Sequence, residues 1–177
     1  ITLKFGLSAA FILLVSLSII TMGLSTYQVS ISYFHRDLEN KIKSTAELAA
    51  IMIPAESHEL LQSSDDEESP AYQTVKSVLQ KIRNTNPEVR FIYTMKKIKD
   101  KVHFIVDAET DPEQMSHVMD PYDDASGSIF TFFNNPENTY IENEFQTDKW
   151  GTFLSGYAPV FDKDKKFLFA VGVDIDA

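Results

Sequence analysis

The chain has 177 residues, 26 of them acidic and 16 basic, with a formal net charge of −10 and no cysteine. A surface this acidic is repelled by nucleic-acid phosphates, so we expect no nucleic-acid partner, and the lack of cysteine excludes a disulfide framework. The charges are unevenly distributed, because residues 5–34 contain no Asp, Glu, Lys or Arg and every acidic residue follows this run.

The segment Phe5–Leu24 is apolar enough to cross a bilayer, since it contains only Ala, Val, Ile, Leu, Met, Phe, Gly, Ser and Thr. Twenty helical residues rise about 30 Å, which matches the hydrocarbon thickness. A cleaved signal peptide has a shorter apolar core, roughly 7–15 residues long. We therefore expect residues 1–27 to form a permanent transmembrane helix. Because the first residue is Ile1 rather than Met, we also expect a piece of a longer protein.

Residues 28–54 are expected to continue as an amphipathic helix, because apolar residues recur every three or four positions and Pro54 ends the pattern. The membrane-proximal apolar positions are Ile31, Phe34, Leu38 and Ile42. Two roles are open for these four residues. They either pack on the chain's own domain or form a homodimer interface with the same helix of a second subunit.

Residues 55–177 are long enough for one domain with its own core. Ser69 and Pro70 predict the start of a helix, and Asn86-Pro87 its end. The acidic run at 65–68 precedes this helix. It is either a divalent-cation site or a solvated loop that assists the helix start, and consecutive acids without an EF-hand pattern favour the loop. We therefore predict no metal site.

Alternating apolar and polar residues predict two β-hairpins. The first joins strands at 89–96 and 102–107, and the second joins Thr152–Phe161 to Phe167–Ile175. Between the hairpins, Thr110–Lys149 (the crossover) is rich in Asp, Asn, Pro and Ser, with a short helix expected near Ser126–Phe133. A connection this long in a compact domain is usually functional or carries its own structure.

The last predicted strand has two different faces. One face carries Phe167, Phe169, Val171, Val173 and Ile175, and the other carries Leu168, Ala170, Gly172 and Asp174. The bulky face suits packing under helices. The second face, with small residues and one carboxylate, suits a cavity.

The order of helix, short helix, hairpin, long crossover and hairpin is that of a PAS-like sheet. Three segments carry a more specific resemblance. They are Asn86-Pro87-x-x-Arg90-Phe91-Ile92-Tyr93-Thr94, Asp148-x-Trp150-Gly151-x-x-x-Ser155-Gly156-Tyr157-Ala158-Pro159 and Val171-Gly172-Val173-Asp174-Ile175. With the preceding membrane helix, they make the chain resemble the extracytoplasmic Cache sensor domains of bacterial receptors.

This resemblance implies an α+β fold with a PAS-like central antiparallel sheet and a long N-terminal helix, preceded by a transmembrane helix. It implies a single sensor module outside the cytoplasm, anchored in the bacterial inner membrane. A second membrane helix and a cytoplasmic output domain would follow Ala177. The implied partner is a small molecule, either a carboxylate or an amine, and no cofactor is expected.

Seven residues are candidates for the ligand site. They are Arg90, Tyr93, Asp107, Tyr122, Trp150, Tyr157 and Asp174. Asp174 lies on the small-residue face of the last strand, where it would either face a ligand, as the resemblance implies, or pair with Arg90 on the neighbouring first strand. The aromatic candidates either line a pocket or belong to the core.

The sequence contains no G-x-S-x-G, H-E-x-x-H or P-loop motif and no cysteine nucleophile, so no catalytic residues are predicted. The main hypothesis is therefore a ligand-sensing domain rather than an enzyme. The alternative is a pocketless domain that only dimerises or binds a partner protein outside the cytoplasm. A cavity lined by Tyr and Trp would favour the first hypothesis, and a sheet face filled by its own side chains would favour the second.

Overall fold

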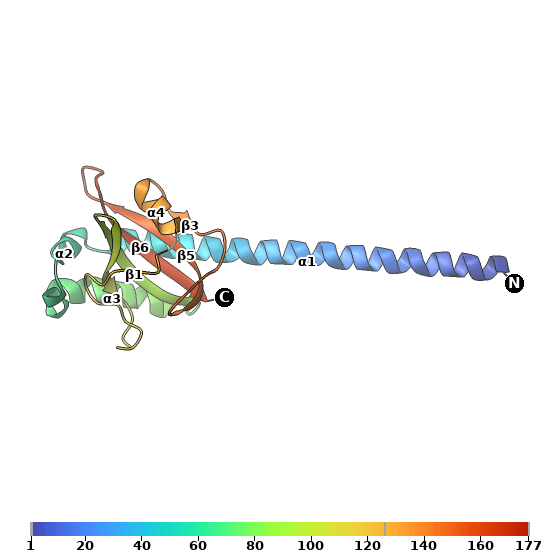
Figure 1. Cartoon of the computed structure of the whole chain (residues 1–177), viewed down its shortest axis with the longest axis horizontal. Helices are drawn as coiled ribbons and strands as arrows, with labels where there is room; N and C mark the ends of the chain where they lie inside the picture. The colour runs from blue at the N-terminus through green and yellow to red at the C-terminus, as the bar shows by residue number, and fades with distance from the viewer. Residues whose placement is uncertain (1, 126, 177) are drawn as a thin grey trace. The chain divides into compact units, whose positions relative to one another are not determined.

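The computed structural model describes residues 2–125 and 127–176, and their side chains from Phe5 onward (Figure 1). Ile1, Ser126 and Ala177, which fall within the predicted segments, lie outside the described residues. The chain divides into two compact units, Ile1–Leu38 and Glu39–Ala177, and each is described by itself.

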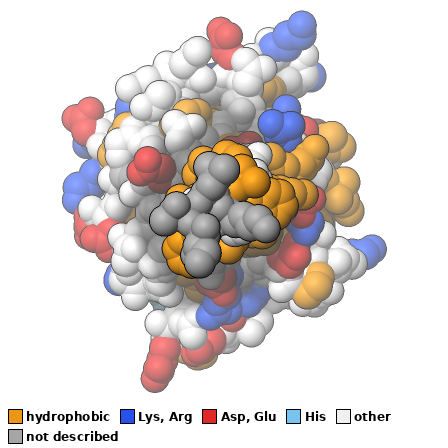
Figure 2. Space-filling model, turned by 90° about the vertical axis from the view of Figure 1, so that its right-hand side faces the viewer, with side chains coloured by type: hydrophobic (Ala, Val, Ile, Leu, Met, Phe, Trp, Pro, Cys, Tyr) orange, Lys and Arg blue, Asp and Glu red, His pale blue; other side chains and the backbone are white. Residues whose placement is uncertain are grey.

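Helix α1 (Thr2–Met52) begins in the first unit. Within the described part of the chain, it contains the one segment that is long and apolar enough, by length and composition, to cross a membrane. Its side chains from Phe5 to Leu24 are exposed, and Figure 2, which views this helix from its N-terminal end, shows hydrophobic side chains on it. The hydroxyls of Ser18 and Thr21 bond to backbone carbonyls of the same helix. The segment fits a transmembrane helix, because lipid offers no partner for polar groups.

The second unit contains an antiparallel sheet of six strands. The strands are β1 (Val89–Ile98), β2 (Lys101–Asp107), β3 (Tyr140–Ile141), β4 (Gln146–Asp148), β5 (Gly151–Phe161) and β6 (Phe167–Asp176). Their order is β2-β1-β6-β5-β3, and β4 also pairs with β5. The first and last long strands, β1 and β6, are therefore central neighbours (Figure 1). This arrangement confirms the predicted central antiparallel sheet.

The last turns of α1 pack against one face of the sheet. Ile42, Ala46 and Ala49 are completely buried. A Cβ atom at Gly156 of β5 would lie 2.3 Å from Cγ2 of Ile42, so only glycine allows the helix to approach this closely. The helix ends before Pro54 and is followed by the short helix α2 (Ala55–Glu59).

Helix α3 (Pro70–Thr85) covers the same sheet beside β1 and β2. It begins as predicted, with the Ser69 hydroxyl accepting a hydrogen bond of 3.1 Å from the backbone N–H of Tyr72. The acidic run before it forms the 3₁₀ helix η1 (Ser64–Glu68). Two of these acids accept hydrogen bonds from the backbone, Asp66 from Gln62 and Ser63, and Glu67 from Val118 of the crossover.

His58 of α2 is buried on the helix-covered face of the sheet. Its ring stacks on Phe169 with centroids 3.5 Å apart, and its Nε2 lies 2.8 Å from the Thr94 hydroxyl. Burial, together with the nearby charge of Lys96, lowers the pKa of His58 well below its usual value. Phe169 therefore faces the helices, as the sequence predicted.

Phe167 lies on the opposite side from the one predicted. Its ring centroid lies 6.2 Å and 6.0 Å from those of Phe132 and Phe133 in α4 (Gly127–Asn134), the expected short helix of the crossover. The β5–β6 register shifts between Val160 and Phe161, which breaks the alternation at the start of β6. The simple period of two was therefore wrong for this residue.

Candidate functional site

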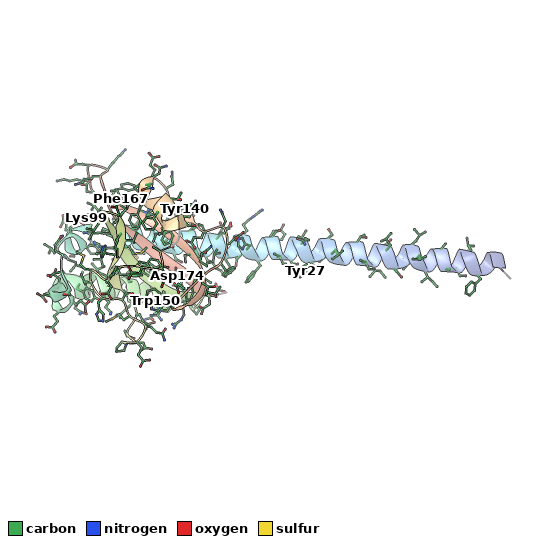
Figure 3. All side chains as sticks on the ribbon, viewed as in Figure 1. Tyr27, Lys99, Tyr140, Trp150, Phe167 and Asp174 are labelled. Atoms are coloured by element: carbon green, nitrogen blue, oxygen red, sulfur yellow. The ribbon has the colours of Figure 1, made fainter. Side chains whose placement is uncertain are left out.

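A small cavity lies between the crossover and the face of the sheet that α1 and α3 do not cover. It is lined by three carboxylates, an amide, a hydroxyl and six aromatic rings. These belong to Asp107, Asp148, Asp174, Gln114, Ser116, Phe91, Tyr93, Phe104, Tyr122, Trp150 and Phe153. Figure 3 labels Trp150 and Asp174 in this part of the domain.

Asp174 of β6 lies on the sheet side of the cavity. It accepts a hydrogen bond of 3.0 Å from the hydroxyl of Tyr93, on the neighbouring strand β1. A Cβ atom at Gly172 would lie 2.2 Å from Cε2 of Tyr93, so the missing side chain makes room for this ring. Burial raises the pKa of Asp174 to about 7, and the charges of Asp148 and Glu142 act in the same direction.

Asp107, at the end of β2, organises the loop that follows it. Its two carboxylate oxygens accept hydrogen bonds from the backbone N–H groups of Glu109, at 2.8 Å, and Ser116, at 2.9 Å. These bonds close the loop that brings Gln114 and Ser116 to the cavity. Burial raises the pKa of Asp107, although these two hydrogen bonds and the charge of Lys76 oppose that rise.

Asp148, at the end of β4, closes the cavity on the other side. Its Oδ1 accepts a hydrogen bond of 2.8 Å from the backbone N–H of Trp150, and its Oδ2 accepts one of 3.0 Å from the Tyr122 hydroxyl. Burial raises the pKa of Tyr122, with a further contribution from Asp148, so the phenol remains a hydrogen-bond donor. A bond between two side chains thus joins the part of the crossover before α4 to the β4–β5 hairpin, where the crossover ends.

The cavity is small and acidic. The space open to the centres of water-sized molecules is about 20 Å³, and a water needs roughly 10–15 Å³ measured in this way. None of the described residues that line it is Lys, Arg or His. Carboxylates that no cation of the lining neutralises favour a positively charged hydrogen-bond donor and repel an anion.

Five of the seven candidate residues line this cavity. They are Tyr93, Asp107, Tyr122, Trp150 and Asp174. Tyr157 is not among the lining residues; it is buried, and its hydroxyl donates to Glu142 at 3.3 Å.

Arg90 also lies outside the cavity lining. Its Nη1 is 3.5 Å from the Glu109 carboxylate, and its Nη2 donates to the Gln114 side chain. The suggested pairing of Arg90 with Asp174 was therefore wrong, because the carboxylate of Asp174 is buried beside Tyr93 and Arg90 binds residues that follow β2.

Six lining residues were not predicted. They are Phe91, Phe104, Gln114, Ser116, Asp148 and Phe153. The strand alternation could have indicated Phe91 and Phe153, which lie two residues from other side chains on the cavity face. Asp148 belongs to the segment that carried the family resemblance. Gln114 and Ser116 belong to irregular backbone, whose side-chain directions no sequence period predicts.

The proposed dimer residues also differ from one another in exposure. Ile31 is 46 % and Phe34 64 % exposed, so both are available for contact with a second subunit. Ile42 is completely buried in the single chain and Leu38 is 5 % exposed. The prediction of an interface through Ile42 was therefore wrong, because this side chain belongs to the chain's own core.

No protein-family model matches the chain, and no curated protein sequence matches it. Solved structures do match. The ligand-binding domain of the Campylobacter jejuni chemoreceptor Tlp3, in complex with 4-methylisoleucine, is 14 % identical with a TM-score of 0.55; the match covers 80 % of this chain and 52 % of that one. The E. coli DcuS sensor domain is 16 % identical with a TM-score of 0.51, covering 80 % and 90 %. The periplasmic sensory domain of C. jejuni Tlp1 is 10 % identical with a TM-score of 0.52, covering 82 % and 56 %.

These matches define the fold. The described domain has the α+β, PAS-like fold of bacterial extracytoplasmic sensor domains, as the sequence resemblance implied. The chain spans about half the length of the chemoreceptor domains that it matches and most of the length of the DcuS domain.

Proposed function

We propose that this chain contains the ligand-sensing domain of a bacterial membrane receptor, with the ligand bound between the sheet and the crossover. The observation that carries the proposal is the small cavity in which Asp174 and Asp148 lie among aromatic rings. Pockets of this kind, mainly apolar with a few polar groups and a carboxyl group of raised pKa, are typical of binding sites. The shared fold supports the same function.

The proposed ligand is a small organic amine in its ammonium form. Of the two classes that the sequence analysis left open, a carboxylate would be repelled by Asp107, Asp148 and Asp174. An ammonium group donates charge-assisted hydrogen bonds to carboxylates, and its charge compensates the cost of ionising Asp174 in a buried position.

In the proposed receptor, residues 1–27 form the transmembrane helix, 28–54 the membrane-proximal helix and 55–177 the sensor domain. The sensor lies outside the cytoplasm of a bacterium and the anchor lies in its inner membrane. A second membrane helix and a cytoplasmic output domain would follow residue 177. The apolar length of α1 and the fold of the domain support this arrangement.

The receptor is proposed to be a parallel homodimer. The exposed apolar side chains of Ile31 and Phe34 are candidates for the contact between the two α1 helices. A twofold axis parallel to these helices would bring the same residues of both subunits together.

Thermal unfolding of the chain in lipid nanodiscs tests the ligand class. Small amines such as methylammonium and ethylenediamine, with acetate and succinate as the carboxylate arm, would be added one at a time. A ligand at a hundred times its dissociation constant stabilises the folded state by about 2.7 kcal/mol. We expect stabilisation by an amine, its loss in Asp174→Asn, and its retention in the control Asp164→Asn, which changes an exposed carboxylate in the β5–β6 turn.

The small volume of the cavity favours a second candidate function, a domain that dimerises or binds a partner protein without a small ligand. In that case the side chains of the sheet and crossover already fill most of their shared space. Stabilisation by none of the amines or carboxylates would support this alternative and overturn the proposed ligand class.

A further inference from the structure

Asp148 is the carboxylate of the cavity that binds a side chain of the crossover, whereas the Tyr93 side chain that binds Asp174 lies on a strand. Both oxygens of Asp107 accept hydrogen bonds from backbone N–H groups, which cannot rotate independently as a side chain does. Asp174 lies against the sheet with Tyr93. Asp148 uses one oxygen for a backbone N–H, that of Trp150, and the other for the Tyr122 hydroxyl, which belongs to a side chain that can rotate.

Both partners of the bond between Tyr122 and Asp148 line the cavity. The backbone of Tyr122 is fixed at the edge of β2, where its N–H donates to the Val102 carbonyl at 2.9 Å. The Tyr122 side chain then reaches Asp148 at the β4–β5 hairpin. Its ring lies 5.1 Å from that of Phe104 and 6.0 Å from that of Trp150, centroid to centroid. With these groups in place, the space open to the centres of water-sized molecules is about 20 Å³, which leaves little room for an organic amine.

We propose that Asp148 recognises the ligand by exchange, with the ligand's ammonium group replacing the Tyr122 hydroxyl on Oδ2. This inference rests on the proposed amine-sensing function and names the carboxylate that first receives the amine. The Tyr122 hydroxyl is a neutral donor to the Asp148 carboxylate, whereas an ammonium adds a positive charge that both Asp148 and the nearby Asp174 attract. The ammonium also screens Asp148 from Asp174, whose charges repel each other.

The exchange has a structural consequence. Once its hydroxyl is released, the Tyr122 ring leaves its place beside Trp150. The part of the crossover before α4 then loses its side-chain link to the β4–β5 hairpin. Ligand binding is thereby coupled to the position of the crossover. A ligand shifts such an equilibrium only by binding one state better, and here the open state alone offers Oδ2 of Asp148.

Trp150 is the only tryptophan in the chain, so its fluorescence reports on this site without any label. The first measurement is quenching of Trp150 by acrylamide in nanodiscs without ligand. Tyr122→Phe removes only the hydroxyl that binds Asp148, and we expect a severalfold larger quenching constant. The control is Tyr157→Phe, which removes a hydroxyl that donates to the carboxylate of Glu142. Both residues lie outside the cavity lining, so this variant should leave quenching unchanged. Equal quenching in wild type and Tyr122→Phe overturns the proposal.

The second measurement adds methylammonium chloride, with potassium chloride at equal ionic strength as the reference. We expect quenching in the wild type to rise to the level of Tyr122→Phe, which itself should not change further. Asp148→Asn, which can still accept the Tyr122 hydrogen bond, should lose the response. Stabilisation by methylammonium without a rise in quenching overturns the exchange but leaves the proposed function standing. No stabilisation by methylammonium or any other amine overturns both, while the Tyr122→Phe result still shows whether this bond closes the cavity.

Discussion

The hydroxyl of Tyr93 donates a hydrogen bond of 3.0 Å to the carboxylate of Asp174, a residue 81 positions later in the chain. The two meet because β1 and β6 are antiparallel neighbours, with Tyr93 opposite Gly172 and Phe91 opposite Asp174. The Tyr93 ring lies across the position that Gly172 leaves open. This contact joins the first and last long strands and places a buried carboxylate in the cavity.

Gly172→Ala should destabilise the domain. The added methyl carbon would lie 2.2 Å from Cε2 of Tyr93 and must displace that ring from Asp174. Adding atoms to a packed core typically costs about 1–3 kcal/mol, and we expect a loss in this range from the denaturant midpoint. Gly127→Ala is the matched control, since a Cβ atom there meets nothing within 4 Å. Equal stability of the two variants would show that the Tyr93 ring does not need this space.

Asp174→Asn should change how stability depends on pH. The folded-state pKa of about 7 lies above the ordinary aspartate value of 3.8, so the folded protein binds a proton more readily than the unfolded chain. This proton-linked stability is fully present below pH 3.8 and is lost as the pH rises to 7. It amounts to at most about 4 kcal/mol, and Asp174→Asn, which cannot ionise, should remove this dependence on pH.

The measurement for Asp174→Asn is the free energy of unfolding between pH 4 and 8 in both proteins, compared as a difference. Other shifted groups, such as Asp107 and His58, are common to both proteins and cancel. A difference that stays constant with pH would mean that Asp174 is already ionised throughout this range.

Binding of methylammonium should strengthen as the pH rises through 7. The amine requires an ionised Asp174, and its own charge does not change over this range. The apparent affinity is proportional to the fraction of the protein in which Asp174 is ionised. Below the pKa of Asp174 this fraction, and with it the affinity, falls about tenfold for each pH unit. Titrations at pH 5, 6, 7 and 8, followed by Trp150 fluorescence, would measure this slope. Asp174→Asn should show no binding at any of these pH values, and a wild-type affinity independent of pH would exclude a role for this ionisation.

Crosslinking should identify the face of α1 that meets a second subunit. The chain has no cysteine, so single cysteines at Ile31, Phe34 and Ile42 can be compared directly. We expect disulfide formation in membranes at Ile31 or Phe34, which are exposed, and none at Ile42, which is buried in its own domain. Arg36→Cys is a further exposed control. Equal rates at Phe34 and Arg36 would argue against a specific helix–helix interface.

The sequence alone determined the parts of this protein that depend on local pattern. The charge-free run predicted an apolar helix, Ser69-Pro70 predicted the start of α3, and alternating residues predicted both hairpins. These features follow from contacts within a few residues, such as the hydrogen bond of Ser69 to Tyr72. The order of the elements was then enough to indicate the PAS-like sheet and the strand face that carries Asp174.

Tertiary structure alone decided which side chains meet in the cavity and which do not. Arg90 binds Glu109 and Gln114 rather than Asp174, and Ile42 packs against Gly156 rather than a second subunit. Each outcome depends on the path of a long irregular crossover or on how closely two elements approach. No periodic pattern in the sequence predicts these contacts, because the partners lie far apart in the chain. Only the packing of the whole domain brings them together.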